Sequence, residues 1–389
     1  MNQRMQRLQQ RLTEDDVSMA LYATSANLQY FLDDTSYAWQ RTMYTGGLSQ
    51  FQDTAVSGHF LNLPDCILCV PRTGEPVLLT TYRRAQDMEG LGIRKELGFF
   101  TDMPDMLASH LPGGTIALGE SCNAFLKKTL KEINPALEIT SAEEYGEQLR
   151  AVKDTDEIAR LRHLAVFTDQ AMARITESLR PGISSQEVEG LISGIARENN
   201  LLDLPFPSTA RFIKTDDPRC DAIDGFPVTE ALTPGTSVGF DFGYVIDGYC
   251  SDFGRSFYIG KAPVEIADGY KSLQEAQCDL LARIKPGIKM DLCFQSLYKK
   301  MSERGYEKYL RKYGDFGLMG HQIGIDVHER PWVHTDQEAL FVPGMVMCIE
   351  PKFWWPGKCF MRVEDMVLIT ETGCESLTKF NRELFELPV

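Results

Sequence analysis

Short apolar runs alternate with polar, helix-like segments in the first part of the chain. These runs are residues 18–22, 66–70, 76–80 and 115–118. Strands that alternate with helical segments are typical of an α/β domain. We therefore expect an α/β domain over residues 1–150.

A longer helical pattern begins near residue 151. The apolar side chains close to one stripe of this segment are Ile158, Leu161, Ala165, Met172, Ile175 and Leu179. Such spacing predicts an amphipathic helix, and Ser184 with Glu187 three residues later predicts the start of the next one. The change of pattern places a domain boundary at about residue 150, with a second domain over 151–389.

One short sequence motif of the second domain occurs twice. Arg-Pro-Gly-Ile at residues 180–183 returns as Lys-Pro-Gly-Ile at 285–288, 105 residues later. Three identical residues and one conservative Arg-to-Lys difference could arise by chance alone. A helical segment precedes and follows each copy, however, and this favours an internal duplication.

Composition excludes several classes of protein. The 389 residues are 43% hydrophobic and 24% charged, which is ordinary for a globular protein and excludes disordered and fibrous chains. The formal net charge of −15 disfavours binding to nucleic acid or anionic membranes. The polar start of the chain, the lack of a 20-residue apolar span and ten scattered cysteines predict a soluble cytoplasmic protein with reduced thiols.

Two aspartates flank a predicted β-hairpin. Asp247–Gly248 lies between two apolar runs, which is a strong hairpin signal. A two-residue turn there sets Asp241 opposite Gly254 and puts Asp252 on the same face, about 7–8 Å from Asp241 at the backbone. Two buried acids need a positive partner, such as a divalent metal ion. The alternative is that each aspartate caps a turn or pairs with a nearby cation such as Arg255.

Further candidate ligands follow near the end of the chain. His321, His328 and His334 are three of only six histidines, although a lone histidine is more often structural. Glu350 and Glu364 stand within strongly apolar runs, where a carboxylate needs a partner.

The two glutamates constrain the length of the loop between them. A two-residue turn at Pro356–Gly357 would put Glu364 on the face opposite to Glu350, so we predict a loop with an odd number of residues or a bulge. Four carboxylates and one imidazole would then form an oxygen-rich set suited to two divalent ions, of Mn, Co, Fe or Zn.

In these contexts the five residues resemble the ligands of the pita-bread metallopeptidase superfamily, in the branch of Xaa-Pro dipeptidases, aminopeptidase P and creatinase. The matching motifs are Asp241 in Asp-x-Gly, Asp252 in Gly-Tyr-x-Ser-Asp-x-x-Arg, His321 in Gly-His-x-x-Gly, Glu350 in Glu-Pro and Glu364 in Arg-x-Glu-Asp. The resemblance covers almost the whole chain. It implies an α+β fold, with a pseudo-twofold pita-bread domain after a smaller creatinase-like α/β domain, and a homodimer.

The resemblance also implies a role for each ligand. Asp252 and Glu364 would bridge two metal ions, most readily manganese, and Asp241 and His321 would be terminal ligands. Glu350 would be both a ligand and the general base for the attacking water. The expected activity is hydrolysis of a small amide or peptide, of the Xaa-Pro dipeptidase type.

Two further residues would act on the substrate or the ligands. By the same resemblance, His328 would contact the substrate carbonyl or oxyanion, and Arg362 would support the ligands.

The sequence departs from the peptidase pattern at two positions. Asp224 replaces a substrate-binding histidine, and Gly317 replaces a second histidine. A carboxylate at position 224 would favour a cationic group on the substrate. The alternatives are therefore a metal-dependent hydrolase or lyase of a small non-peptide substrate, such as a dimethylsulfoniopropionate lyase or a C–N hydrolase, and a catalytically silent binding protein.

Overall fold

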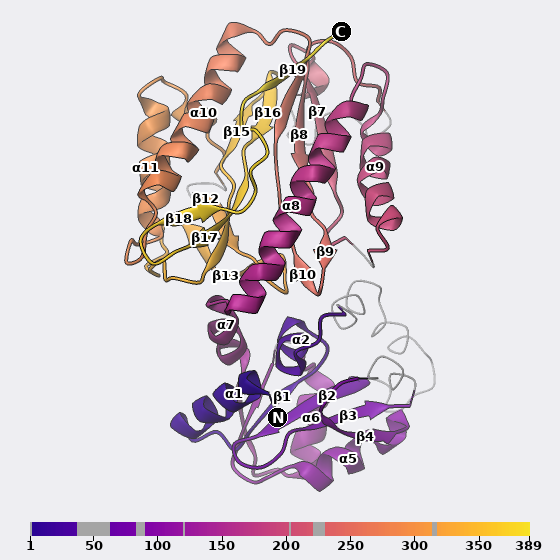
Figure 1. The fold of residues 1–389 in the computed structure, drawn as a ribbon. Helices are drawn as coiled ribbons and strands as arrows, with labels where there is room; N and C mark the ends of the chain where they lie inside the picture. Colours follow the sequence, from indigo (N-terminus) through magenta and orange to yellow (C-terminus); the bar gives the residue numbers. More distant parts are fainter. Residues whose placement is uncertain are drawn as a thin grey trace. The chain divides into compact units, whose positions relative to one another are not determined.

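The computed structural model describes residues 2–36, 63–82, 90–119, 121–201, 204–220, 230–312 and 317–389. The chain forms two compact units, Met1–Arg150 and Ala151–Val389 (Figure 1). None of the described helices is long and apolar enough to cross a membrane.

The first unit contains one six-stranded sheet, in the order β4-β3-β2-β1-β5-β6. Its strands are β1 (Met19–Tyr22), β2 (Cys66–Pro71), β3 (Val77–Thr81), β4 (Arg94–Gly98), β5 (Thr115–Leu118) and β6 (Glu138–Ser141). Its helices within the described residues are α1 (Gln3–Glu14), α2 (Ala26–Leu32), α5 (Met103–His110), α6 (Ala124–Ile133) and α7 (Glu143–Ala151). The four apolar runs became β1, β2, β3 and β5, because their side chains form the buried core of this unit.

The second unit has two helix pairs that flank its strands in Figure 1. The helices are α8 (Thr155–Ser178), α9 (Ser185–Glu198), α10 (Val264–Arg283) and α11 (Asp291–Ser302). Helix α9 begins at the predicted capping box: the Ser184 hydroxyl accepts from the Glu187 amide, and the Glu187 carboxylate accepts from the Ser184 amide.

The strands of the second unit form two sheets and two short hairpins. One sheet has the order β19-β11-β8-β7, and the other has the order β13-β12-β14-β17-β18. Their bounds are β7 (Thr209–Lys214), β8 (Thr236–Asp241), β11 (Ser256–Ile259), β12 (Leu318–Gln322), β13 (Glu329–His334), β14 (Val346–Ile349), β17 (Asp365–Ile369), β18 (Cys374–Ser376) and β19 (Phe385–Leu387). The hairpins are β9 (Val245–Ile246) with β10 (Tyr249–Cys250), and β15 (Lys352–Trp355) with β16 (Cys359–Arg362).

The repeated Pro-Gly phrase makes the same contacts in both copies. Each copy joins the two helices of a pair, and its glycine, Gly182 or Gly287, has a positive φ of 94° or 81°. The amide of Gly182 donates to the carbonyl of Leu232, and the amide of Gly287 donates to the carbonyl of Phe341, at 2.8 and 2.9 Å. These equivalent contacts confirm the predicted internal duplication.

The duplication extends to the strands that carry candidate ligands. Asp241 follows Leu232 at the same spacing as Glu350 follows Phe341, and a Pro-Gly step lies between them in both copies. Asp241 ends β8, and Glu350 directly follows β14. Asp241 and Glu350 are therefore equivalent residues of the two halves.

The first hairpin has the predicted turn. Ile246 pairs with Tyr249, and both residues of the Asp247–Gly248 turn have positive φ, which defines a type I′ turn. The same register continues through β8 and β11, so Asp241 faces Gly254 as the sequence predicted.

The second hairpin has the predicted odd loop. Trp355 pairs with Cys359, which leaves the three residues 356–358 in the loop. The same register continues between β14 and β17. Glu350 and Glu364 therefore stand at opposite positions of one extended hairpin and on the same face.

Candidate metal centre

The structure brings together all five residues that the sequence singled out as ligands. They are Asp241 at the end of β8, Asp252 between β10 and β11, His321 on β12, Glu350 after β14 and Glu364 between β16 and β17. Asp241 is 30% exposed at its side chain, and the other four side chains are buried.

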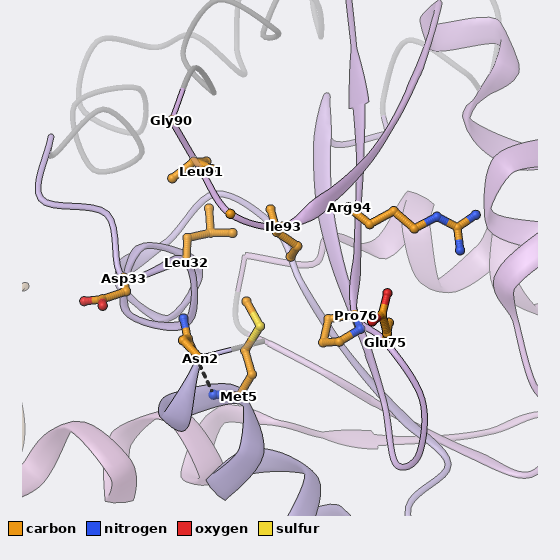
Figure 2. Close-up of a pocket in the computed structure, with 11 residues that line it drawn as sticks. Asn2, Met5, Leu32, Asp33, Glu75, Pro76, Gly90, Leu91, Ile93 and Arg94 are labelled. Atoms are coloured by element: carbon orange, nitrogen blue, oxygen red, sulfur yellow. Dashed lines mark hydrogen bonds between the residues drawn. The ribbon is translucent and has the colours of Figure 1, made fainter.

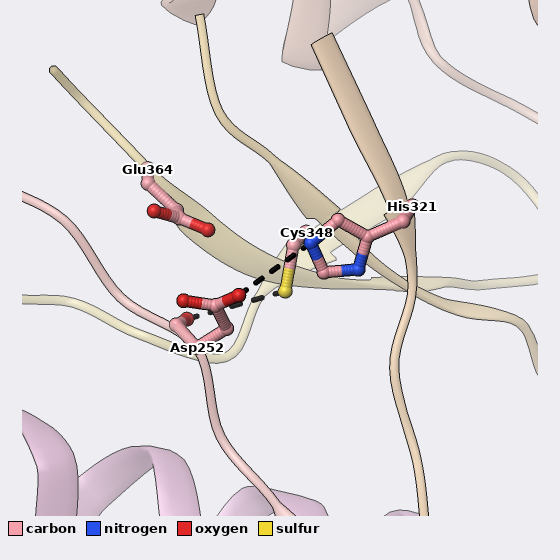
Figure 3. Close-up of side chains that lie close together, drawn as sticks. All are labelled: Asp252, His321, Cys348 and Glu364. Carbon is pink, nitrogen blue, oxygen red and sulfur yellow. Dashed lines mark hydrogen bonds and ion pairs between the residues drawn. The ribbon is translucent and has the colours of Figure 1, made fainter. Parts of the chain in front are cut away.

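His321 and Asp252 lie close together in this cluster (Figure 3). His321 Nε2 lies 3.5 Å from Asp252 Oδ2 and 3.9 Å from Glu350 Oε1. The other ring nitrogen, Nδ1, lies 2.9 Å from the carbonyl of Gln322, which can only accept a hydrogen bond. Nδ1 is therefore the donor of this hydrogen bond, and Nε2 is the ring nitrogen that faces the carboxylates.

Two of the buried acids, Asp252 and Glu364, hold their protons more tightly than exposed acids do. Burial, and then the neighbouring acid Asp241, raise the pKa of Asp252 well above its ordinary value. Burial, and then Asp252, do the same to the pKa of Glu364. These directions show how strongly the cluster needs positive charge.

Several donor atoms of the cluster remain unsatisfied. His321 Nε2, Asp252 Oδ1 and Glu364 Oε1 are buried without a hydrogen-bond partner among the described residues. Buried polar atoms normally have such partners, so three at one point need a specific explanation. An imidazole nitrogen and carboxylate oxygens are the donors that divalent transition metals take, and the residues present therefore fit such ions.

Two cations border the acids. Arg362 Nη1 lies 2.7 Å from Asp241 Oδ2 and 2.9 Å from Glu364 Oε2, so the residue does contact the predicted ligands. Lys352 Nζ lies 2.5 Å from Glu350 Oε2. Burial raises the pKa of Glu350, but Lys352 and then Arg362 outweigh burial and lower it to about 2. Glu350 is therefore ionised at neutral pH.

His328 lies beside His321 at the solvent-exposed edge of the cluster. The two imidazole rings have their centroids 4.5 Å apart, and the His328 ring stacks on Trp332. Partial burial, and then His321, lower the pKa of His328 below its ordinary value. His328 is therefore neutral at pH 7 and has an N–H group that can donate a hydrogen bond.

A buried arginine fixes the backbone around two of the acids. Arg255 Nη1 donates to the carbonyls of Gly254 and Glu364, at 2.9 and 2.5 Å. Its Nη2 atom forms an ion pair with Asp365. The alternative interpretation of Arg255 as the partner of Asp241 or Asp252 was therefore wrong, because its guanidinium is already satisfied by Asp365 and by backbone carbonyls.

Two residues at this centre were not predicted from the sequence. Cys348 and Lys352 each stand two positions from Glu350, so strand alternation puts their side chains on its face. That alternation was the signal that could have identified them. Asp224, the predicted substrate-binding residue, lies outside the described residues.

A separate cavity of about 360 Å³ lies in the first unit (Figure 2). Its lining includes Asn2, Met5, Asp33, Glu75 and Arg94. None of the candidate ligands is among its lining residues, so this cavity does not belong to the metal centre.

Comparison with known proteins identifies the family. The model of metallopeptidase family M24 matches residues 159–371, which include all five candidate ligands. The chain is 31% identical over 264 residues to a putative dipeptidase, YkvY, of Bacillus subtilis, covering 66% of this chain and 69% of that protein. It is also 31% identical to a probable dipeptidase, PepE, of Mycobacterium bovis, covering 62% of each chain. The chain belongs to metallopeptidase family M24, as its sequence predicted.

Solved structures confirm the α+β pita-bread fold. The prolidase from Pyrococcus horikoshii OT3 superposes with a TM-score of 0.83 at 21% identity, over 98% of this chain and 100% of that one. An Xaa-Pro dipeptidase from Bacillus anthracis gives a TM-score of 0.80 at 22% identity, over 99% of both chains. At this identity the likeness establishes the fold.

Proposed function

We propose that the protein is a dinuclear metal-dependent dipeptidase of the Xaa-Pro type. The observation that carries this proposal is a cluster of four carboxylates and one imidazole, all but Asp241 buried, in which three ligand atoms lack a hydrogen-bond partner among the described residues. Family membership and the dipeptidase and prolidase names of its relatives support the reaction class.

The ligand roles follow from the resemblance to the metallopeptidase family. Asp241, Asp252, His321, Glu350 and Glu364 would hold the two ions; by the resemblance to the family, Asp252 and Glu364 would be shared between them, with Asp241 and His321 as terminal ligands and Glu350 as a further ligand. The oxygen-rich set favours manganese, with Co, Fe or Zn as alternatives. Two such ions would lower the pKa of a water molecule and stabilise negative charge on the peptide carbonyl oxygen.

Two residues handle the proton and the developing charge. Glu350 is ionised, so its carboxylate can accept the proton of the attacking water and later deliver it to the leaving amine. The neutral His328 donates a hydrogen bond to the carbonyl oxygen, where it stabilises the oxyanion of the transition state.

The β15–β16 hairpin offers a binding site for the far end of a dipeptide. Lys352 pairs with Arg362 across the strands, and Trp354 pairs with Phe360 one step further on the same face. The cationic pair suits the free carboxylate of a dipeptide, and the aromatic pair suits an apolar ring such as proline. The candidate ligands, the cationic pair and the aromatic pair thus follow one another along the same face. This sequence of groups favours a substrate of two residues.

The proposal also covers the protein's cellular location, its oligomeric state and its binding partners. All ten cysteines are free, which suits a reducing cytoplasm. The protein forms a homodimer in this proposal, because its sequence resembles the prolidase branch. A chain of net charge −15 has no general attraction for nucleic acid. The proposed partner is therefore a small-molecule or dipeptide substrate.

Metal analysis and a dipeptide panel test the proposal. Protein purified without chelator should bind about two transition ions per chain, and the manganese-loaded enzyme should hydrolyse Xaa-Pro dipeptides. Fewer than about one ion per chain would contradict the dinuclear site. Two bound ions without turnover of any dipeptide would contradict the peptidase assignment. If Asp224→His then gained activity, a cationic, non-peptide substrate of the parent enzyme would be indicated.

A further inference from the structure

Cys348 occupies a central place on the face that carries the candidate ligands. It pairs with His321 on β12 and with Met366 on β17. It stands two residues from Glu350, and its partner Met366 stands two residues from Glu364. Strand alternation therefore directs its side chain toward the metal centre.

The thiol sulfur lies within the cluster (Figure 3). Cys348 Sγ and one ligand atom each of Asp252, His321 and Glu364 lie within 4.8 Å of one another, and all four residues are buried. The only hydrogen bond recorded for the thiol within the described chain is a long one, 4.0 Å, to the backbone carbonyl of Asp252.

Two other residues of this cluster have buried atoms without a hydrogen-bond partner among the described residues. The unsatisfied Nε2 of His321 and Oε1 of Glu364 belong to side chains that are 1% and 0% exposed. Sulfur and nitrogen donors on one tetrahedral ion are about 3.6 Å apart, given bonds of about 2.3 and 2.1 Å. The donors of this cluster lie within 4.8 Å of one another, so movements of about 1 Å would bring them to that spacing.

We propose that Cys348 is a sulfur ligand of the ion that His321 binds. This inference rests on the proposed dinuclear centre. The thiol proton leaves to solvent as the metal–sulfur bond forms. A thiolate is a soft donor, so this position prefers Zn, Co or Fe over Mn, whereas the oxygen ligands around Asp241 retain the preference for Mn.

Cobalt spectroscopy tests the assignment without relying on activity. Chelator-treated protein is titrated with Co²⁺, and its absorption is recorded for the wild type, Cys348→Ser and Cys359→Ser. Cys359 is the control because it is also buried in this unit but is not in the ligand cluster. The wild type and Cys359→Ser should show a near-ultraviolet sulfur-to-cobalt band, and Cys348→Ser should lack it.

Competition between ions gives a second readout. The ratio of Zn²⁺ to Mn²⁺ affinity should fall at least about tenfold in Cys348→Ser and stay unchanged in Cys359→Ser. Visible cobalt bands without the near-ultraviolet band in the wild type would overturn the sulfur ligand while leaving the dinuclear centre intact. The absence of both kinds of band would overturn the metal centre as well. The wild-type spectrum decides the question even if Cys348→Ser does not fold.

Discussion

Arg255 and Asp365 form an ion pair in which Nη2 lies 2.7 Å from Oδ1 and both side chains are fully buried. We predict that Arg255→Met lowers the free energy of unfolding by about 3–5 kcal/mol, because Asp365 would lose its main buried partner. Urea denaturation measures this change. Arg283→Met is the matched control: its pair with Asp279 is exposed, so its cost should stay below about 1 kcal/mol.

The same pair predicts the direction of an acid transition. Burial raises the pKa of Asp365, but Arg255 and then Arg382 outweigh burial and hold it below its ordinary value. The folded state therefore binds this proton less readily than the unfolded state. The stabilisation is complete above the unfolded pKa, about 4, and is lost as pH falls through the folded pKa. Urea titrations at several pH values should show that Arg255→Met weakens this loss of stability at low pH. An unchanged pH dependence below about pH 4 would contradict the role of the Arg255–Asp365 pair.

Glu350→Gln should lower kcat at least about 100-fold, because an amide cannot accept the proton of the attacking water. Steady-state hydrolysis of an Xaa-Pro dipeptide measures the loss. Glu338→Gln is the control, since Glu338 is 86% exposed and pairs only loosely with Lys289. Full turnover by the Glu350 variant would remove Glu350 from the mechanism.

His328→Ala should reduce kcat about 100-fold and leave the metal content near the wild-type value, because His328 donates to the substrate and is not a ligand. Metal analysis alongside kinetics separates the two roles. His334→Ala, from the end of the neighbouring strand β13, should change neither quantity. Loss of metal in the His328 variant would instead make it a ligand.

Lys352→Met should raise KM for a dipeptide about 10- to 100-fold, because the substrate carboxylate loses one charged hydrogen bond. The same substitution should change KM little for the corresponding dipeptide amide. The ratio between the two substrates isolates carboxylate recognition from any effect on Glu350. Lys358→Met is the control, since Lys358 in the hairpin loop pairs with Asp216. Equal losses on both substrates would leave carboxylate recognition without support.

Strand alternation explains which parts of the site the sequence could predict. The Asp247–Gly248 turn fixes a register, so the placement of Asp241 opposite Gly254 could be calculated from residue numbers alone. Glu350 and Glu364 can share a face only if the loop between their strands has an odd number of residues. The loop has three residues. Local turn chemistry was sufficient in both cases.

Contacts between distant strands could not be calculated in this way. Cys348 meets His321 only because β12 pairs with β14, and nothing local to either strand specifies that pairing. The partner of Arg255 was misjudged for a similar reason, since Asp365 is 110 residues away along the chain. Sequence patterns thus predicted elements and registers better than long-range partners.

The three-residue loop between β15 and β16 constrains how related sequences can diverge. Inserting or deleting one residue there would shift the register by one and turn Glu364 to the other face of the hairpin. A change of two residues would preserve the facing of both glutamates. Viable insertions and deletions at residues 356–358 should therefore come in even numbers, so that whether this loop has an odd or an even length is inherited as strictly as the identity of a buried ligand.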